Sequence, residues 1–185
     1  LNANAPTPLW MVQRLERAGH RSISVLVDST SYVMLTLGQP MHVYDLDAIK
    51  GTLTARMAKS GESVKLLNEQ THTLQDDVLV IADDEKSLGM AGVMGSFDSK
   101  AELHTQNIFL EAAFFAPECI QGKTRRFKLT SDAAHRFERG VDFMGQIEAL
   151  EYATQLVQEI CGTDALQIGA VSEVVGQLLQ RERIS

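Results

Sequence analysis

The stretch LTSDAAHRFERG, from Leu129 to Gly140, gathers many of the side chains that can do chemistry in water. Hydroxyl, carboxylate, imidazole and guanidinium groups occur close together, and each can bind a charged ligand or move a proton. A packed core excludes such a segment, and an ordinary solvated helix does not need the pair Ala133 and Ala134 before the histidine. Ser131 is a candidate nucleophile, but no base stands beside it, and serine is also a common helix cap. The segment therefore predicts either a wall of a functional site or a helix braced by its own polar groups.

Glu111 is a carboxylate inside the apolar run NIFLEAAFF. If the run is a strand, alternation places Glu111 on the same face as Phe109 and Ala113. Burying an unpaired carboxylate there would cost several kcal/mol. Two interpretations follow: an edge strand with Glu111 facing water, or a pocket carboxylate that meets a polar group of a ligand.

Three shorter features carry similar alternatives. His42, in GQPMHVYD, is either a structural histidine or a ligand-binding one. In AGVMGS, Gly92 and Gly95 indicate either a tight turn or a backbone that a ligand approaches closely. Thr30 is either a helix cap or a nucleophile, and no adjacent base is visible in the sequence.

Positive charge is concentrated in one segment of an otherwise acidic chain. Between Gln121 and Gly140 six lysines and arginines stand against two carboxylates, whereas the net charge of the whole chain is −7. A basic segment on an acidic body is typical of a polyanion bound at one edge, and Lys123, Arg125 and Arg126 are then candidate contacts. A solvated helix face with dispersed counter-charges explains the same pattern. The overall acidity argues against a general nucleic-acid binder.

Several classes of function lack their sequence patterns. The chain contains no phosphate-binding loop, no dinucleotide fingerprint and no HExxH zinc motif. Cys119 and Cys161 lie far apart without a CxxC neighbour, so we expect no metal site and no disulfide framework. The sequence shows no run of about 18 apolar residues and no signal pattern. We therefore expect a soluble, cytoplasmic domain that does not enter a membrane.

The fold that positions these groups can be outlined from periodicity. With 185 residues, 44% hydrophobic and 22% charged, the chain can bury one sizeable core. Caps and apolar spacing predict helices over residues 7–19, 28–38 and 142–162, and a further helix start at Pro117. The last long helix is the clearest, and its expected buried stripe is Ile147, Leu150, Ala153, Leu156, Val157 and Ile160.

Between residues 52 and 116 the apolar period changes to two, which predicts a series of short strands separated by turns. The segment GQPMHVYDLDAIKG before them is interpreted as a loop, because Pro40 disfavours helix at the preceding residue. The segment from Thr163 is interpreted as a strand and then a polar exit. The pattern predicts an α+β fold, a folded-over mixed β-sheet or open barrel flanked by helices.

Five motifs in collinear order resemble the B3/B4 editing domain of bacterial phenylalanyl-tRNA synthetase beta subunits. They are GQPMHVYDLDAIKG, LVIAD, AGVMG, FLEAAFF and SDAAHRFERGVD. The resemblance extends from PLWMVQRLERAG to ATQLVQEICG and so covers nearly the whole chain. It implies a domain of B3/B4 type over residues 1–175 and an exit segment, residues 176–185, toward the next domain of a longer subunit.

The resemblance also implies roles for individual residues in a pocket that hydrolyses tRNA(Phe) mischarged with tyrosine. Glu111 resembles the glutamate that recognises the tyrosine hydroxyl, and Gly95 resembles the glycine that leaves room for the bound side chain. Ala133 falls where the family controls the size of the pocket. The LTSDAAHRFERG stretch would then form one wall, with its arginines either facing the tRNA end or pairing with acids nearby. The residues implied as catalytic, around the aminoacyl ester, are His42, Thr30 and Ser131.

The sequence departs from the family pattern at four positions. Ser131 replaces a threonine and keeps its hydroxyl group. Ser31 replaces an asparagine, Ser96 a glycine and Ala134 a serine. These differences concern the fine shape of the pocket.

The resemblance further implies partners and a mechanism. The partners are tRNA(Phe) and an alpha subunit in an (alpha-beta)2 assembly, where ATP and Mg²⁺ serve aminoacylation. The domain itself is expected to need no cofactor and to charge no tRNA. Ester hydrolysis requires an oriented water and a polarised carbonyl more than a covalent nucleophile. Two alternatives stay open: a non-catalytic tRNA-docking module, and a structural spacer of the same synthetase.

Overall fold

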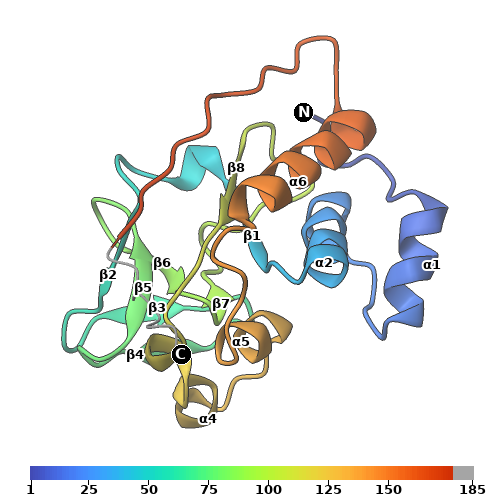
Figure 1. The fold of residues 1–185 in the computed structure, drawn as a ribbon. Coiled ribbons are helices and arrows are strands. Elements are labelled where there is room, and N and C mark those ends of the chain that lie inside the picture. Colours follow the sequence, from blue (N-terminus) through green and yellow to red (C-terminus); the bar gives the residue numbers. More distant parts are fainter. Residues whose placement is uncertain (177–185) are drawn as a thin grey trace.

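Helices and strands gather in two adjoining layers in the computed structural model of the chain, which describes residues 1–176 (Figure 1). One layer is helical, and the other holds a four-stranded sheet. The helices of the first layer are α1 (Leu9–Arg17), α2 (Val25–Leu37) and α6 (Gln146–Cys161). The strands of the sheet are β2 (Thr54–Met57), β5 (Leu79–Ala82), β6 (Ser87–Met90) and β7 (Met94–Gly95). This arrangement confirms the predicted α+β class.

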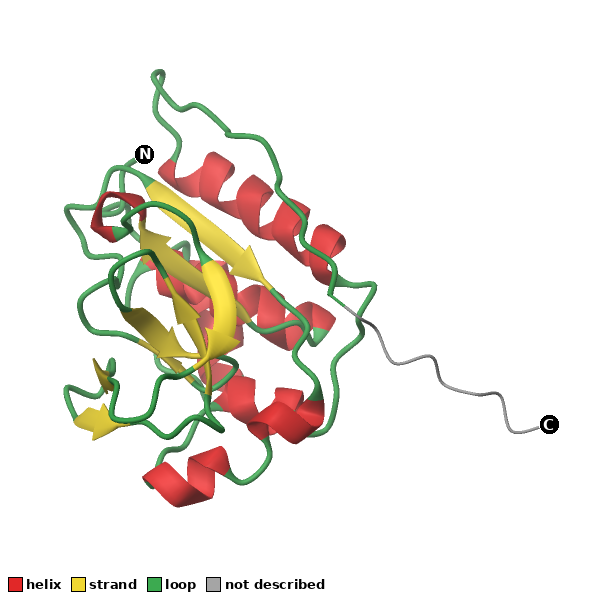
Figure 2. Cartoon of the chain, turned by 90° about the vertical axis from the view of Figure 1, so that its left-hand side faces the viewer, coloured by secondary structure: helices red, strands yellow, loops and turns green. Residues whose placement is uncertain are grey.

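Every strand pair in the described chain is antiparallel. Besides the four-stranded sheet, β1 (Met41–Asp45) pairs with β8 (Ile108–Ala112), and β3 (Ser63–Lys65) pairs with β4 (Thr71–Thr73). The strands thus form three antiparallel sheets, whereas the predicted arrangement was a folded-over mixed sheet or an open barrel. Short turns such as those joining β3 to β4 and β5 to β6 can connect only antiparallel neighbours. The turned view in Figure 2 shows these strands standing against the helical layer.

Strand β1 corrects the prediction of a loop at Met41–Asp45. Gly38, at φ +73°, ends α2 in the left-handed conformation, and the chain then turns into five residues that pair with β8 in continuous register. The pattern was missed because the partner of this short strand lies far along the sequence. On the helical side β1 contacts α2 and β8 contacts α6, so the two-stranded ribbon joins the two layers.

Three short helices close one side of the main core. They are α3 (Pro117–Ile120), α4 (Lys123–Phe127) and α5 (Asp132–Phe137). The 3-10 turn η1 (Leu46–Ala48) lies elsewhere, in contact with β8. Pro117 occupies the first turn of α3, as predicted from its missing N–H. Ile120 and Phe137 pack with Leu66, Leu88 and Met90 in one buried cluster. The core of the strand layer is therefore sealed by the segment that precedes α6.

Helix boundaries differ from the predicted ones where tertiary contacts decide them. Helix α2 begins at Val25 with Ser24 as its cap, before the predicted start at residue 28. Helix α6 begins at Gln146, later than predicted, and the segment 162–176 contains no strand. The predicted strand after Thr163 is therefore wrong within the described chain. The expected exit segment lies, apart from residue 176, outside the described residues.

The buried face of α6 is also rotated from the predicted stripe. Ala153, Leu156 and Val157 are buried as expected, but Ile147 is 41% exposed. Ala149 is fully buried instead, because α6 packs against both α2 and β8. Small side chains at residues 149 and 153 let α6 approach α2 closely.

Asp28 fixes the N-terminal segment to α2. Its carboxylate is 1% exposed and accepts hydrogen bonds from the Thr7 hydroxyl (2.6 Å), the Ser22 hydroxyl (2.6 Å) and the Ile23 amide (2.9 Å). Thr7 therefore does not cap α1, which starts after Pro8. Three donors on one buried carboxylate offset the loss of its hydration.

Replacing Asp28 by alanine should lower the free energy of unfolding by about 3 kcal/mol, because three hydrogen bonds to one buried carboxylate are lost. Urea unfolding of the parent and the Asp28→Ala variant would measure the difference. Asp76→Ala is the matched control, since Asp76 is exposed, and it should change stability by less than about 0.5 kcal/mol. Equal effects of the two substitutions would contradict the structural role of Asp28.

Candidate functional site

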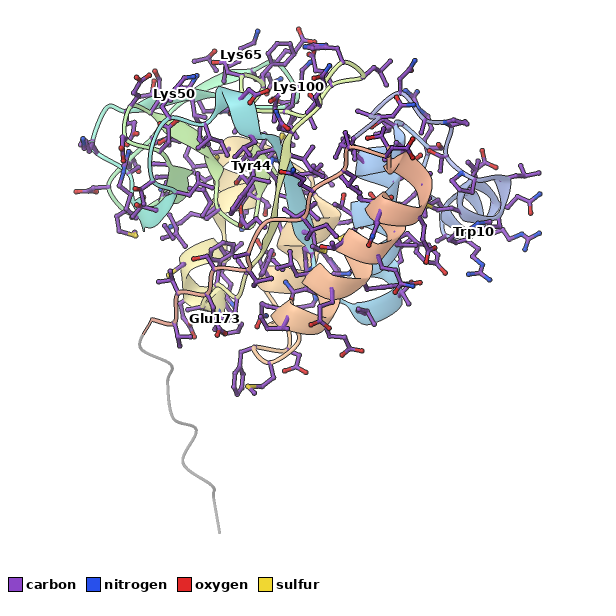
Figure 3. All side chains as sticks on the ribbon, turned by 90° about the horizontal axis from the view of Figure 1, so that it is seen from above. Trp10, Tyr44, Lys50, Lys65, Lys100 and Glu173 are labelled. Atoms are coloured by element: carbon purple, nitrogen blue, oxygen red, sulfur yellow. The ribbon has the colours of Figure 1, made fainter. Side chains whose placement is uncertain are left out.

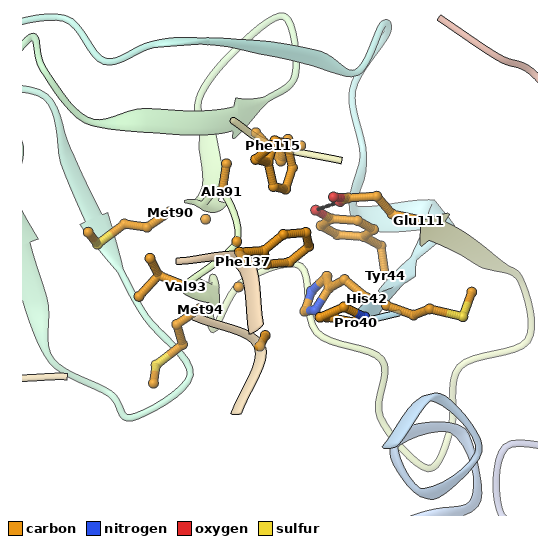
Figure 4. Close-up of a pocket in the computed structure, with 16 residues that line it drawn as sticks. Pro40, His42, Tyr44, Met90, Ala91, Val93, Met94, Glu111, Phe115 and Phe137 are labelled. Carbon is orange, nitrogen blue, oxygen red and sulfur yellow. Dashed lines mark hydrogen bonds between the residues drawn. The ribbon is translucent and has the colours of Figure 1, made fainter. Parts of the chain in front are cut away.

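A cavity of about 70 Å³ lies where β1, β8, the β6–β7 turn and α5 meet (Figure 4). Most of its wall is apolar, with Met90, Val93, Phe115 and Phe137 among the lining side chains. The polar part of the wall is small and comes from the β1–β8 ribbon. A volume of this size has room for several water molecules.

Three polar side chains project from neighbouring positions of the ribbon. His42 pairs with Glu111 across the two strands, and Tyr44 lies two residues beyond His42 on the same face. All three line the cavity, and Figure 4 shows them on the side facing Phe115 and Phe137. The site is thus an apolar cavity with ionisable side chains on one side.

Glu111 lines the cavity, and the contact with a polar group of a ligand that its second interpretation includes stays a prediction. Its Oε2 atom accepts a hydrogen bond of 2.5 Å from the Tyr44 hydroxyl. Burial raises the pKa of the Glu111 carboxyl, and the bond from Tyr44 partly offsets this rise. Burial and the adjacent Glu111 carboxylate together raise the pKa of the Tyr44 hydroxyl far above its usual range. Tyr44 therefore stays a hydrogen-bond donor throughout the physiological pH range.

His42 presents a neutral imidazole to the same space. Its ring packs edge-on against Tyr44, with centroids 4.3 Å apart. Its Nε2 atom is buried and has no hydrogen-bond partner among the described residues. Burial lowers the pKa of His42 to about 4, so the ring is uncharged at neutral pH. A buried ring nitrogen without a partner at a cavity wall is suited to a hydrogen bond with a ligand or a water.

The two glycines of the β6–β7 segment serve different purposes. Gly92 turns the chain at φ +68°, and a Cβ atom there would lie 3.0–3.1 Å from Ile120, Phe115 and Phe137. At Gly95 a Cβ atom would overlap the His42 imidazole. The absence of a side chain at Gly95 therefore makes room for the His42 imidazole. The prediction that Gly95 leaves room for the side chain of a bound ligand is not tested by this packing.

The LTSDAAHRFERG stretch forms α5 and contributes one wall. Ala133 and Phe137, one turn apart, line the cavity, while Ala134 is fully buried in the core. The Ser131 hydroxyl accepts a hydrogen bond from the Ala134 amide at 3.0 Å and caps the helix. Arg136 donates to the Asp132 carbonyl, which braces the exposed side. The two alanines thus let α5 approach both the cavity and the core.

The structure brings together four of the six predicted pocket residues. His42, Gly95, Glu111 and Ala133 line one cavity, whereas Ser131 does not. Thr30 also lies outside the lining, in α2, where its hydroxyl donates to the Val27 carbonyl at 3.0 Å. The hydroxyl groups of Thr30 and Ser131 are both engaged in helix hydrogen bonds.

Sequence reasoning missed Tyr44, Phe115 and Phe137. Tyr44 had a usable signal, because residues two apart in a strand share a face. This alternation holds only in a strand, and from the sequence residues 41–45 are interpreted as a loop. Phe115 and Phe137 carry no local sign of a site, since any buried aromatic residue looks the same in sequence.

Two of the three predicted tRNA contacts are paired within the protein. The Lys123 side chain is only 10% exposed and contacts Asp77 at 2.8 Å. Arg126 makes two 2.6 Å hydrogen bonds to the same carboxylate. Hydrogen bonds from Arg126 and Lys123 lower the pKa of Asp77. Arg125 is exposed and takes no part in this cluster.

A larger hollow of about 650 Å³ lies between α6, β8 and residues 165–172. Its wall is made mostly of apolar and amide side chains, and Glu151 is the one ionisable side chain among the described residues that line it. It therefore offers few groups that could take part in a reaction.

The part of the chain described by the structure has no group of three His, Cys, Asp or Glu side chains placed to hold a metal ion. Likewise, none of its helices is long and apolar enough to cross a membrane. Figure 3 shows how the labelled lysines lie along one edge of the molecule, with Trp10 at another.

Comparisons with known proteins agree on one family. A family model described as the B3/4 domain matches residues 1–162. The chain is 58% identical over 165 residues to the phenylalanine–tRNA ligase beta subunit of Dechloromonas aromatica, covering 89% of this chain and 21% of that protein. It is 51% identical over 185 residues to the beta subunit of Cupriavidus pinatubonensis, covering 100% of this chain and 22% of that protein. The chain spans about a fifth of the length of the curated relatives it matches.

Among solved structures, the chain is similar to an N-terminal fragment of the phenylalanyl-tRNA synthetase beta subunit from Pyrococcus horikoshii. The TM-score is 0.43 and the sequence identity 15%, with 70% of this chain and 40% of that chain covered.

The buried, neutral His42 should make stability depend on pH. The pKa of His42 is about 4 in the folded chain, whereas in the unfolded chain the imidazole has its ordinary pKa of 6.5. Between pH 4 and pH 6.5 the unfolded chain therefore binds more protons than the folded chain. The free energy of unfolding should therefore fall as the pH drops from about 6.5 to about 4, by up to about 3 kcal/mol.

Urea unfolding between pH 4.5 and pH 7 would measure this dependence in the parent and in His42→Gln. The variant should show a flatter profile, because it has no proton to take up on unfolding. His104→Gln is the control, since the His104 side chain is 79% exposed, and it should keep the slope of the parent. An equal slope in the parent and in His42→Gln would rule out a buried neutral His42.

Proposed function

Because the chain belongs to the B3/4 domain family, we propose that it is the editing domain of a phenylalanine–tRNA ligase beta subunit and hydrolyses tyrosyl esters of tRNA(Phe). The attacking group in this proposal is a water molecule, and the bond that breaks joins the tyrosine carbonyl carbon to the ribose oxygen. The family membership rests on the match over residues 1–162 and on the beta-subunit relatives. The substrate and the reaction are the proposed part.

The observation that carries the proposal is the Glu111 carboxylate in the wall of an otherwise apolar cavity. Phenylalanine and tyrosine differ by one hydroxyl group, and a pocket selects poorly against a ligand that only adds a hydroxyl. A second site that hydrogen-bonds this hydroxyl rejects phenylalanine strongly, because phenylalanine would leave a buried polar group unpaired. Glu111 supplies such an acceptor, while Phe115 and Phe137 offer aromatic surface to the ring.

His42 is proposed to orient the attacking water. Within the part of the chain that the structure describes, its Nε2 atom has no hydrogen-bond partner, and the ring is neutral at physiological pH. A pKa of about 4 makes the imidazole a weak base, since efficient general bases have pKa values near the working pH. Orientation of the water by a hydrogen bond is therefore the stronger role for His42.

The other predicted residues receive indirect or steric roles in this proposal. Ala133 sets the size of the cavity beside α5, and Gly95 leaves room for the His42 imidazole. Thr30 and Ser131 are proposed to act by fixing α2 and α5, because their hydroxyl groups are bound within those helices. Arg125 is the proposed tRNA contact of the basic segment, while Lys123 and Arg126 hold α4 against Asp77.

The remaining expectations concern the whole synthetase and are proposals for this chain. We propose that it works in the cytoplasm, beside an alpha subunit in an (alpha-beta)2 assembly that binds tRNA(Phe). ATP and Mg²⁺ serve aminoacylation elsewhere in that assembly. The alternative function is a non-catalytic tRNA-docking or structural module, in which the cavity makes no contact with the aminoacyl group. The exposed basic side of α4 favours the docking form of this alternative.

Glu111→Ala should reduce the preference for tyrosyl over phenylalanyl esters by roughly 10- to 150-fold, which corresponds to about 1.5–3 kcal/mol for a hydrogen bond to a charged group. Deacylation of Tyr-tRNA(Phe) and Phe-tRNA(Phe) would be compared in the complete synthetase. Glu111→Gln keeps the size of the side chain and should lose less. A recognition role lowers the rate ratio, whereas a general-base role lowers both rates equally. An unchanged ratio would remove Glu111 from hydroxyl recognition, and no deacylation by the parent would favour the non-catalytic alternative.

The docking contact can be tested with cations whose side chains have no ion-pair partner among residues 1–176. Arg125 and Lys128 are both exposed, so Arg125→Ala with Lys128→Ala should weaken tRNA(Phe) binding and reduce its salt dependence by about 1–2 units of slope. Filter binding by the complete synthetase at several salt concentrations would measure both quantities. The matched control is Arg21→Ala with Lys59→Ala, two exposed cations on other segments. Equal slopes for the two double variants would identify the α4 side as an ordinary solvated face.

A further inference from the structure

We propose that Tyr44 is a positioning residue of this site, which holds one oxygen of Glu111 and keeps the carboxylate ionised so that its other oxygen can accept a ligand hydroxyl. The consequence for selectivity rests on the proposed function, but the effect on Glu111 does not. Nothing in the sequence motifs singled out Tyr44. The inference comes from the contacts that the β1–β8 pairing creates.

The geometry fixes the Tyr44 hydroxyl in one place. Tyr44 is 2% exposed, and its backbone lies between Phe109 of β8 and an antiparallel bridge to Lys100. Its ring packs edge-on against His42 at 4.3 Å and tilted against Phe109 at 6.2 Å. A ring confined on these sides delivers its hydroxyl to Glu111 without further ordering, so little conformational entropy is lost when a ligand binds.

The hydrogen bond itself has the form expected of an ionised acceptor. Its length of 2.5 Å falls in the range of O–H···O⁻ bonds, about 2.5–2.7 Å. Neutral O–H···O bonds are most often about 2.7–2.8 Å long. Tyr44 reaches only Oε2, and Oε1 has no hydrogen-bond partner among the described residues. Oε1 is thus available as a second, charge-assisted acceptor.

Among the described residues that line the cavity, Tyr44 alone donates a hydrogen bond to the Glu111 carboxylate. Of the side chains lining the cavity, His42 and Tyr44 of β1 are the only other titratable ones within the described chain. The linings from β6, the following turn, β7 and α5 are apolar residues or glycine. Burial raises the pKa of the Glu111 carboxyl, the Tyr44 bond lowers it, and His42 is neutral at physiological pH. Removing the Tyr44 hydroxyl should therefore leave burial unopposed.

The expected signature is a shift in pH dependence. A carboxylate acceptor is present above its pKa and is lost as the pH falls through that value. Without the Tyr44 hydroxyl this transition should move upward by about one to two pH units, the amount that one hydrogen bond to a charged group represents. A purely structural role of Tyr44 would lower selectivity by the same factor at every pH.

The first experiment uses Tyr44→Phe in the complete synthetase. The ratio of deacylation rates for Tyr-tRNA(Phe) and Phe-tRNA(Phe) would be measured from pH 5 to pH 9. We expect the variant to lose its tyrosyl preference at a pH one to two units above that of the parent and to regain much of it at pH 9. Tyr32→Phe is the matched control, because Tyr32 is a buried tyrosine of α2 outside the cavity lining, and it should keep the profile of the parent. An unshifted midpoint in Tyr44→Phe, or a loss equal at all pH values, would overturn the inference.

The second experiment measures the titration of the Glu111 carboxyl directly and does not depend on deacylation. Carbon-13 NMR of the glutamate side-chain carboxyls in the 185-residue chain would give the titration midpoint of Glu111, assigned by its loss in Glu111→Gln. The midpoint should rise by one to two units in Tyr44→Phe and stay unchanged in Tyr32→Phe. A shifted midpoint without any deacylation by the synthetase would reject the proposed function and retain the role of Tyr44. Equal midpoints in the parent and in Tyr44→Phe would reject the role of Tyr44 even if deacylation is normal.

Discussion

The antiparallel pairing of β1 with β8 is the constraint on which the site depends. It joins two segments from distant parts of the sequence and sets their register over five residue pairs, from Met41 with Ala112 to Asp45 with Ile108. Because side chains alternate along a strand, this register decides that His42, Tyr44 and Glu111 share one face. A slip of one residue would turn Glu111 away from Tyr44. The helices α2 and α6 pack against the ribbon and hold the register in place.

The cavity combines apolar walls with a single cluster of ionisable side chains, and the apolar walls affect how that cluster binds and ionises. Apolar walls strengthen a hydrogen bond to a carboxylate, but they also favour its neutral form. Burial raises the pKa of the Glu111 carboxyl, and the hydrogen bond from the Tyr44 hydroxyl opposes that rise, which is the basis of the positioning role proposed for Tyr44. No residue of α4 lines the cavity, and Lys123 and Arg126 of that helix are held by Asp77. The electrostatics of the site are therefore local, and the net charge of the chain says little about them.

Much of the fold could be predicted from local signals. The strands at residues 54–57, 63–65 and 79–82, the helix start at Pro117 and the core of α6 follow from period, turn residues and caps. The family follows from five collinear motifs and is confirmed by the match over residues 1–162. The features that escaped include strand β1, whose partner is remote in sequence, and the start of α2, which precedes the buried Asp28 carboxylate. In both, long-range contacts outweigh the local pattern.

The sequence by itself determined which residues were available for chemistry: a carboxylate in an apolar strand, a histidine near a proline, and two alanines on a short polar helix. It did not determine which of them meet. Only the tertiary structure brought Glu111 to Tyr44, placed His42 over Gly95, and left Thr30 and Ser131 bonded within their own helices. Spacing along the chain specifies neighbours within one helix or strand, where the repeat is fixed. Contacts between distant strands are set by register and by the packing of the layers around them, and a list of residues contains neither.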